Sequence, residues 1–294
     1  MRLPGMPGGA LPAYPHRSEF SVITLGSGSP ELNPIRASAC TAVQYRGRYY
    51  VVDTGNGSAL SFVKGGEFGP YRHRDIAAIL FTHLHQDHVN DYFDVVTTRW
   101  SEGGKRLDVM GPPGTGELHR FLVTFFRDDL QYRLLRGGAA DKDEEGMFTG
   151  VDIRELAGAN QFALGGMRVT TAEMAHSAYG LAYRFEVQGR SIVVTGDTAF
   201  NHRLVDLARG ADIVVVDANP WMDGSVAPPH PASHMSLPEV VRVAAESGVR
   251  TVVLTHLWPL PVDEELVRRT EAAFSAGGYT GRVVFANDGL EVPV

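Results

Sequence analysis

Eight consecutive residues, Phe81 to His88, read FTHLHQDH and carry three histidines and one aspartate, all side chains that bind metal ions. They follow DIAAIL, an apolar stretch with the length and composition of a buried β-strand. Residues two positions apart lie on the same face of an extended segment, so His83 and His85 can bind one ion. Asp87 and His88 come in the turn that follows and can reach a second ion. The stretch therefore predicts metal binding at the end of a strand.

Two ions need more ligands than these four, and three further candidates each end a predicted strand. They are His176 in EMAHS, Asp197 in VVTGDT and His256 in VLTHLWP. A carboxylate has two oxygens and can bridge two cations, which makes Asp197 the natural shared ligand. A single histidine after a strand is more often structural, and Gly-Asp-Thr is more often a turn or a helix cap. Their coincidence with FTHLHQDH is what predicts a metal site.

Strands and helices, which must position these residues, recur in both halves of the chain. Strands are predicted within residues 19–30, 40–57, 75–83, 167–177, 181–198, 211–219 and 251–256, with tight turns at Arg46–Gly47 and Gln188–Gly189. A helix is predicted over LPEVVRVAAESG and ends at Gly248. This recurrence favours two sheets packed together with helices outside.

The stretch from Val89 to Arg136 has apolar residues at helical spacing. It leaves directly from His88 and is the longest stretch between metal-binding motifs. We therefore expect it to pack beside the site, where Phe121, Phe125 and Phe126 would shape one wall. The following GGAADKDEEG is predicted to be an exposed acidic loop.

The composition fits a globular protein, with 294 residues of which 44% are hydrophobic and 21% are charged. Residues 1–17 are predicted to be a flexible Pro/Gly-rich tail, and residues 18–294 a single domain. No apolar run is long enough for a transmembrane helix, and the start lacks the apolar stretch of a secretory signal, so no membrane partner is expected. The single cysteine, Cys40, excludes an internal disulfide and a multi-cysteine zinc knuckle, which agrees with a cytoplasmic location.

Through its metal-binding motifs the chain resembles the metallo-β-lactamase fold superfamily from about Glu19 onward. The resemblance implies an α/β fold, a four-layer αββα sandwich of two mixed β-sheets flanked by helices, with two divalent metal ions at one edge. It also implies a homodimer. Zinc suits the imidazoles, although the mixed nitrogen and oxygen set also admits manganese or iron. The ligands implied are His83, His85 and His176 for one ion, Asp87, His88 and His256 for the other, and Asp197 between them.

Further segments are similar to the ribonuclease Z-like branch, namely LGSGSPELNPIRASAC, VVDTGNG, GPPGTGEL and FANDGLEV. ASHMSLPEVVRVAAESG places His234 just before a helix, as in the segment by which ribonuclease Z and a cyclic phosphodiesterase supply a phosphate-directed histidine. Alternatively, His234 is only a neighbour of a helix cap made by Ser233 or Ser236. Asp217, at the end of DIVVVD, either holds His234 in one tautomer or is a solvated carboxylate at a strand end.

The chemistry implied is metal-dependent hydrolysis of a phosphodiester. Two divalent cations lower the pKa of a shared water and bind the oxygens of the phosphodiester. Asp87 would orient that water, and a protonated His234 would neutralise the developing charge or protonate the leaving alkoxide. Asp87 and His234 are therefore the expected catalytic residues. The remaining histidines lack a comparable context and are expected to be surface or structural residues: His16, His73, His119, His202 and His230.

The substrate expected is a small or cyclic phosphodiester. Asp197 follows His176 by only 21 positions, and a predicted hairpin fills them. Bacterial-type transfer-RNA processing enzymes of the ribonuclease Z family insert a protruding basic arm there. A formal net charge of -7 and a pI near 5.9 also disfavour nucleic acid as the partner, although a local basic groove can exist within an acidic total.

Several alternatives stay open at this point. One is a transfer-RNA 3′-processing endonuclease of the ribonuclease Z type. Others of the same fold are a lactonase, an arylsulfatase-like enzyme, a β-lactamase, a relative of pyrroloquinoline quinone biosynthesis proteins, a diiron electron carrier and a non-catalytic binding protein. The cyclic phosphodiesterase of phosphonate breakdown has a cysteine-rich metal site that a single cysteine cannot form.

Overall fold

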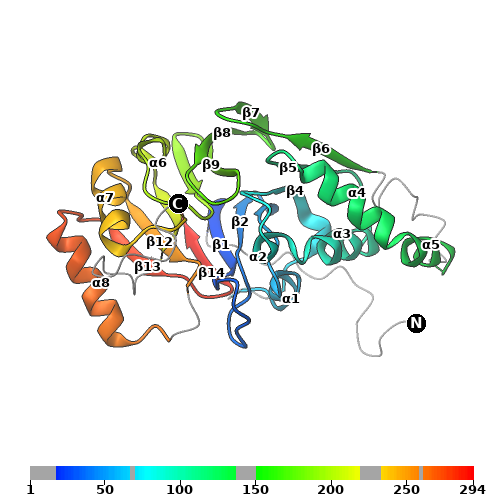
Figure 1. Cartoon of the computed structure of the whole chain (residues 1–294), viewed down its shortest axis with the longest axis horizontal. Helices are drawn as coiled ribbons and strands as arrows, with labels where there is room; N and C mark the ends of the chain where they lie inside the picture. The colour runs from blue at the N-terminus through cyan, green and yellow to red at the C-terminus, as the bar shows by residue number, and fades with distance from the viewer. Residues whose placement is uncertain (1–17, 67–69, 137–149, 219–232, 258–260) are drawn as a thin grey trace.

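The computed structural model describes residues 18–66, 70–136, 150–218, 233–257 and 261–294. Their strands form two sheets of seven strands each, and helices flank them (Figure 1). This is the α/β sandwich of two mixed sheets that the resemblance implied. The predicted tail, the predicted acidic loop, His16 and His230 lie outside the described residues.

Each sheet contains both parallel and antiparallel neighbours. The first sheet has the strand order β14 (Leu290–Pro293), β1 (Phe20–Gly26), β2 (Cys40–Tyr45), β3 (Arg48–Val52), β4 (Ile76–Leu80), β5 (Leu107–Gly111) and β6 (Val151–Glu155). The second sheet has the order β13 (Arg282–Phe285), β12 (Thr251–Thr255), β11 (Ile213–Asp217), β10 (Arg190–Val194), β9 (Gly180–Val187), β8 (Met167–Met174) and β7 (Gln161–Leu164).

The helices divide between the two ends of the sandwich, with α4 and α5 far from α7 and α8 (Figure 1). Those nearer the first sheet are α1 (Ser58–Lys64), the short 3₁₀ helix η1 (His73–Asp75), α2 (Gln86–Val89), α3 (Tyr92–Ser101), α4 (Thr115–Phe125) and α5 (Arg127–Arg136). Those nearer the second are α6 (His202–Ala208), α7 (Leu237–Ser247) and α8 (Glu264–Ala276). No helix of the described ranges has both the length and the apolar character needed to cross a bilayer.

The main core lies between the two sheets. Alternate residues of a strand point to opposite faces, so in β1 the side chains of Phe20 and Val22 face the second sheet. They share that core with Tyr183 and Phe185 of β9. Ile23 of β1 points the other way and packs with the helices that cover the first sheet. All seven residues of β1 are buried, as expected for a strand that is covered on both faces, and none of them is charged.

Local sequence signals set the ends of several elements. Both predicted hairpin turns are present, because Arg46–Gly47 and Gln188–Gly189 adopt the positive φ angles that two-residue turns require. Helix α7 begins with a capping box between Ser236 and Glu239 and ends at Gly248, whose φ is 66°. This helix stands immediately after His234, so its start fixes where that histidine lies.

Candidate metal centre

The seven side chains expected to bind metal meet where strand ends of the two sheets come together. The FTHLHQDH stretch follows β4 of the first sheet. In the second sheet His176 follows β8, Asp197 follows β10 and His256 follows β12. Among these seven side chains two groups form, each with its ligand atoms within 4.8 Å of one another, and a third group joins Asp197 and His256 to Asp217 and His234. The first is His83, His85 and His176, and the second is Asp87, His88, Asp197 and His256.

Asp197 lies between the two groups. Its Oδ2 is 3.9 Å from Nε2 of His83 in the first group and 3.3 Å from Nε2 of His256 in the second. Its Oδ1 is 3.4 Å from Nε2 of His88. One buried carboxylate thus lies within 4 Å of histidines from both groups, which is the position that a shared ligand needs.

Hydrogen bonds at Nδ1 orient the imidazoles toward the cluster. Nδ1 of His88 donates to a carboxylate oxygen of Asp53 at 2.8 Å, and Nδ1 of His176 donates to the backbone carbonyl of Ser233 at 2.8 Å. In both rings the second nitrogen, Nε2, remains available to a metal ion at the centre of the cluster. A hydrogen bond at one ring nitrogen fixes the tautomer and direction of a ligating histidine, so these contacts prepare the rings to bind metal.

Three buried atoms of the cluster lack hydrogen-bond partners, which tests whether the site fits cations. They are Nε2 of His83, Nε2 of His88 and Oδ1 of Asp197. A buried polar atom without a partner costs about 1–3 kcal/mol. Divalent cations held between these atoms would satisfy all three together, and imidazole nitrogens with carboxylate oxygens are ligands that zinc prefers. The residues present therefore fit divalent metal ions.

Two members of the cluster already have the protonation state that binds metal, whereas His88 and His256, whose pKa values are raised by neighbouring carboxylates despite burial, would release a proton on binding an ion. Burial, aided by the positive charge of His88, lowers the pKa of His83 to about 2, so this ring is neutral near pH 7. Burial alone would raise the pKa of Asp197, but the charges of His256 and His88 outweigh it and hold that pKa well below its ordinary value. A neutral imidazole and an ionised carboxylate are the forms that bind metal.

Asp53 is a site residue that the sequence interpretation missed. It follows β3, adopts a φ of 62° and is buried. Besides the hydrogen bond from His88, its carboxylate accepts hydrogen bonds from the backbone amide and the hydroxyl of Thr82, each at 2.7 Å. Asp53 therefore holds Thr82, near the start of the FTHLHQDH stretch, and His88, at its end. Its place in VVDTGNG, a carboxylate at a strand end, was the available signal.

His234 lies beside the cluster and is held by Asp217. Its Nδ1 donates to Asp217 Oδ2 at 2.8 Å and is 4.0 Å from Asp197 Oδ2, while its ring stacks on His256 with the ring centres 5.5 Å apart. Asp217 therefore orients His234. The alternative that Asp217 is a solvated carboxylate is wrong, because only 2% of its side chain is exposed.

Ser236 caps α7, as the alternative interpretation of His234 expected, so the role of this histidine depends on its own contacts. Burial alone would lower the pKa of His234, but the hydrogen bond and charge of Asp217 outweigh it and raise that pKa above its ordinary value. The ring stays 36% exposed. A partly open, protonatable histidine next to the cluster can donate a proton to a bound group.

The other histidines within the described residues have structural or surface settings, as expected. His73 is buried and packs against the ring of Phe62 with the ring centres 4.8 Å apart. His119 lies on α4, with its Nδ1 2.9 Å from the hydroxyl of Tyr92. His202 is exposed at the start of α6.

The three phenylalanines expected to shape a wall divide into two kinds. Phe126 stacks on Phe93 with the ring centres 3.9 Å apart and belongs to the core under the helices of the first sheet, so it is a structural residue. Phe121 and Phe125 protrude from α4 and are 61% and 69% exposed. The start of α4 does approach the metal-binding turn, because a Cβ placed on Gly114 would lie 3.0 Å from Leu84. A substrate wall formed by Phe121 and Phe125 stays a prediction.

Comparisons with known proteins agree with this architecture and with the cluster. Residues 48–257 match the sequence model of the beta-lactamase superfamily domain. The chain is 33% identical over 282 residues to the ribonuclease Z of Mycolicibacterium paratuberculosis, a match that covers 92% of this chain and 96% of that protein. At this coverage the similarity extends over nearly the whole of both proteins.

Solved structures show the same fold. The metallo-beta-lactamase fold protein YhfI from Bacillus subtilis is similar with a TM-score of 0.70 at 17% identity, covering 94% of this chain and 99% of that one. The short form of human tRNase Z has a TM-score of 0.66 at 18% identity, covering 93% and 99%. Family, fold and cluster together make this chain a metal-dependent hydrolase. The chain belongs to the beta-lactamase superfamily, in its ribonuclease Z-like branch.

Proposed function

We propose that this protein is a dinuclear phosphodiesterase formed by residues 18–294 as one domain. In this proposal zinc is the leading metal, with manganese or iron as alternatives. The support is the fit of the cluster to cations and the division of its side chains into two groups joined by Asp197. The proposed ligands are His83, His85 and His176 for one ion, Asp87, His88 and His256 for the second, and Asp197 between the ions.

The ions would supply Lewis-acid activation of water and stabilisation of charge on the phosphate oxygens. Asp87 is buried, and although burial raises its pKa, the hydrogen bond from His256 and the positive charge of His88 lower it well below its ordinary value. An ionised Asp87 can accept a hydrogen bond from water and so orient the attack at phosphorus.

His234 is the proposed general acid, and its position is the observation that carries the phosphodiesterase proposal. Because Nδ1 is engaged by Asp217, Nε2 is the ring atom available to substrate. A protonated His234 would donate its Nε2 proton to the alkoxide oxygen that leaves phosphorus, or stabilise charge on a non-bridging oxygen. Asp217 would keep the ring in the tautomer and orientation that this transfer needs.

For the substrate we propose a small or cyclic phosphodiester. The 21 positions from His176 to Asp197 are filled mainly by strands β9 and β10 and their two-residue turn, which leaves no room for a protruding arm. The net charge of -7 supports the same choice.

Transfer-RNA 3′ processing is the second candidate function. The similarity to the mycobacterial ribonuclease Z over 96% of its length supports it at least as strongly as the hairpin supports a small substrate. The two candidate functions share the metal centre and His234, so they differ only in the substrate, a small phosphodiester or a transfer RNA, that binds there.

The test is a substrate panel with the zinc-loaded full chain. It contains bis-p-nitrophenyl phosphate, 2′,3′-cyclic nucleotides, a transfer RNA with a 3′ extension, a lactone and a sulfate ester. Hydrolysis of both kinds of small phosphodiester with an intact transfer RNA supports the proposal. Cleavage of the RNA at the end of the acceptor stem favours the second candidate. Turnover of the lactone or the sulfate ester alone would show that phosphodiester chemistry is wrong.

A further inference from the structure

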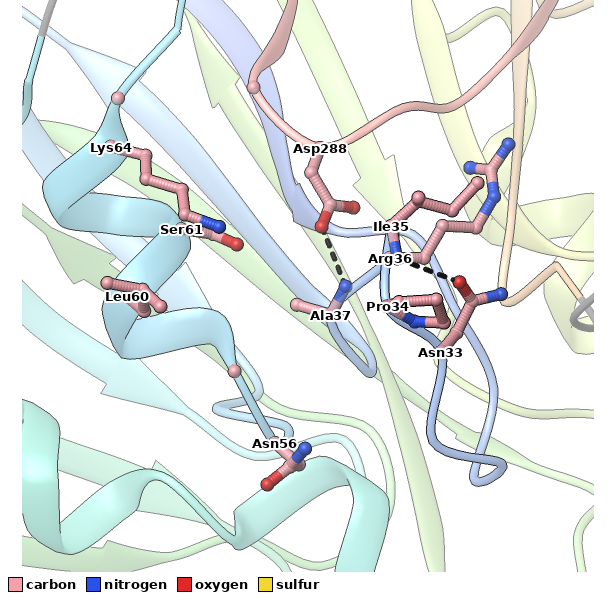
Figure 2. A pocket seen from close by; sticks show the side chains of 13 residues that line it. Asn33, Pro34, Ile35, Arg36, Ala37, Asn56, Leu60, Ser61, Lys64 and Asp288 are labelled. Carbon is pink, nitrogen blue, oxygen red and sulfur yellow. Dashed lines mark hydrogen bonds between the residues drawn. The ribbon is translucent and has the colours of Figure 1, made fainter.

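Two of the segments similar to the ribonuclease Z-like branch, LGSGSPELNPIRASAC and FANDGLEV, contribute no residue to the ligand groups described above. The structure joins these segments through Asp288, which lies in the turn before β14. Its Oδ1 accepts hydrogen bonds from the backbone amide and the hydroxyl of Ser27, at 3.0 and 2.8 Å. Its Oδ2 accepts a hydrogen bond from the backbone amide of Ala37 at 2.7 Å, which is drawn in Figure 2. One carboxylate therefore holds both ends of the loop between β1 and β2.

The side chain of Arg36 adds a second tie to the same loop. One of its terminal nitrogens donates to the hydroxyl of Ser27 and to the backbone carbonyl of Ala286, each at 2.7 Å. Ser27 is fully buried, and its hydroxyl has this donor on one side and the carboxylate of Asp288 on the other. A buried polar group whose partners all come from fixed neighbours has little freedom to move. The position of Ser27 is therefore set by Asp288 and Arg36 together.

Ser27 is in turn bonded to the residue that follows a proposed metal ligand. The backbone amide of Leu257 donates to the carbonyl of Ser27 at 2.8 Å, and Leu257 also forms an isolated β-bridge with Gly28. Leu257 comes directly after His256 in the chain. Asp288 thus reaches the neighbour of His256 in two steps, although it belongs to neither ligand group.

His256 needs such support because its backbone adopts an unfavourable conformation. Its φ is 59°, in the left-handed region that residues with a side chain seldom adopt. In this conformation its Nε2 lies 3.3 Å from a carboxylate oxygen of Asp87 and 3.3 Å from one of Asp197. An unusual backbone conformation persists only where the surrounding contacts enforce it. The hydrogen bond from Leu257 to Ser27 is one contact of this kind.

We propose that Asp288 is a positioning residue for the second ion, whose proposed ligands include His256. Through Ser27 and Leu257 it holds His256 in the left-handed conformation, so that Nε2 is directed at the ion before the ion binds. Without Asp288 the loop can shift and His256 relaxes to an ordinary backbone conformation, which metal binding must then reverse. The inference rests on the dinuclear centre of the proposed function, but it does not depend on the substrate.

The test measures zinc affinity by competition with a chromophoric chelator, in two backgrounds that each lack one ligand. His176→Ala weakens the first ligand group and leaves the second complete, and His256→Ala does the reverse. In the His176→Ala background, Asp288→Ala is expected to weaken zinc binding about 5- to 30-fold, the factor that matches the usual cost of one residue in the left-handed region. In the His256→Ala background Asp288→Ala should have no effect, because the residue through which it acts is gone.

Asp212→Ala, also made in the His176→Ala background, is the matched control for a general loss of stability. Like Asp288, Asp212 accepts a hydrogen bond from a backbone amide, that of Ser191, and its carboxylate also accepts one from Arg250, each at 2.8 Å. Asp212 comes immediately before β11, at the opposite end of that strand from the metal cluster. Asp212→Ala should therefore leave zinc affinity unchanged.

Asp288→Asn is a milder second variant that serves if Asp288→Ala does not fold. It keeps one acceptor oxygen for Ser27 and loses the acceptor for Ala37, so the same pattern is expected with a smaller loss of affinity. Unchanged zinc affinity in the folded Asp288 variants, a loss that persists in the His256→Ala background, or an equal loss in Asp212→Ala would overturn the proposal. Because zinc affinity is measured without substrate, this result is independent of whether the protein cleaves phosphodiesters.

Discussion

Nδ1 of His88 lies 2.8 Å from a carboxylate oxygen of Asp53, and this contact joins a proposed metal ligand to a residue 35 positions earlier in the chain. The same carboxylate accepts two hydrogen bonds from Thr82, immediately before the ligand His83. Asp53 thus anchors both sides of the turn without belonging to either ligand group.

We expect Asp53→Asn to weaken metal binding by about 10- to 100-fold, the usual effect of losing the partner of a ligating histidine. The amide keeps the shape of the side chain but loses the charge and one acceptor oxygen. Competition with a chelator measures the affinity. Asp206→Asn, on an exposed carboxylate of α6, is the control and should bind metal like the wild type. An unchanged affinity in Asp53→Asn would mean that Thr82 alone holds the turn.

His234→Ala should lower kcat on a phosphodiester by about 100-fold or more while metal content and folding stay nearly intact, because only stabilisation of the transition state is lost. Metal analysis and turnover of bis-p-nitrophenyl phosphate are measured on the same sample. His202→Ala removes an exposed histidine and serves as the control. Loss of metal from the His234 variant would make this residue a ligand, a role that its grouping with Asp197, Asp217 and His256 also allows.

Gly196 and Gly210 offer a matched pair of backbone tests, with φ angles of 61° and 62°. Alanine is strained at both, by about 1–2 kcal/mol. At Gly196 the new methyl group would also lie 2.5 Å from Cβ and Oγ1 of Thr82, whereas no atom lies within 4 Å at Gly210. We expect Gly196→Ala to lose about 1–3 kcal/mol more unfolding free energy than Gly210→Ala, and only the former to lose metal affinity. Urea unfolding measures the difference, and equal losses would contradict the clash.

His73 should make the protein less stable in acid. Burial lowers its pKa from 6.5 to about 4, and neither ring nitrogen has a hydrogen-bond partner. Because the unfolded chain binds the proton more tightly, stability is full above pH 6.5 and is lost as the pH falls toward 4. Between pH 7 and pH 5 this loss is about 2 kcal/mol.

Replacing His73 by phenylalanine removes the titrating group. We expect the unfolding free energy of His73→Phe to fall by about 2 kcal/mol less than that of the wild type between pH 7 and pH 5. Urea unfolding of both proteins at each pH gives the double difference, from which the titration of the metal cluster cancels. Identical pH dependence would show that His73 is solvated or partnered in solution.

Features that depend on neighbouring residues could be predicted from the sequence. The two hairpin turns, the end of α7 at Gly248 and the strands before the ligand side chains all depend on local backbone preferences and apolar patterns. Helix α8 was not predicted, although Asp263 caps it and Leu266, Thr270 and Phe274 recur along one buried side.

Contacts across the sandwich could not be predicted from local pattern. The carbonyl of Ser233 meets His176 across 57 positions, and nothing near Ser233 in the chain indicates this. The same limit applied to α4, where helical spacing alone could not show that Phe126 would pack on Phe93 while Phe125 stayed in solvent. These outcomes depend on how the elements dock, which periodicity does not encode.

The ligand cluster is divided between the two sheets, and this division links activity to the completeness of folding. The turn after β4 in the first sheet carries four of the proposed ligands, and the strand ends of the second sheet carry the other three. A chain in which only strands β1 to β6 have folded therefore lacks Asp197, the proposed bridging carboxylate, and two of the proposed histidine ligands. Such a partly folded protein would lack the proposed metal centre, and hydrolysis would begin only after β12, which precedes His256, had docked.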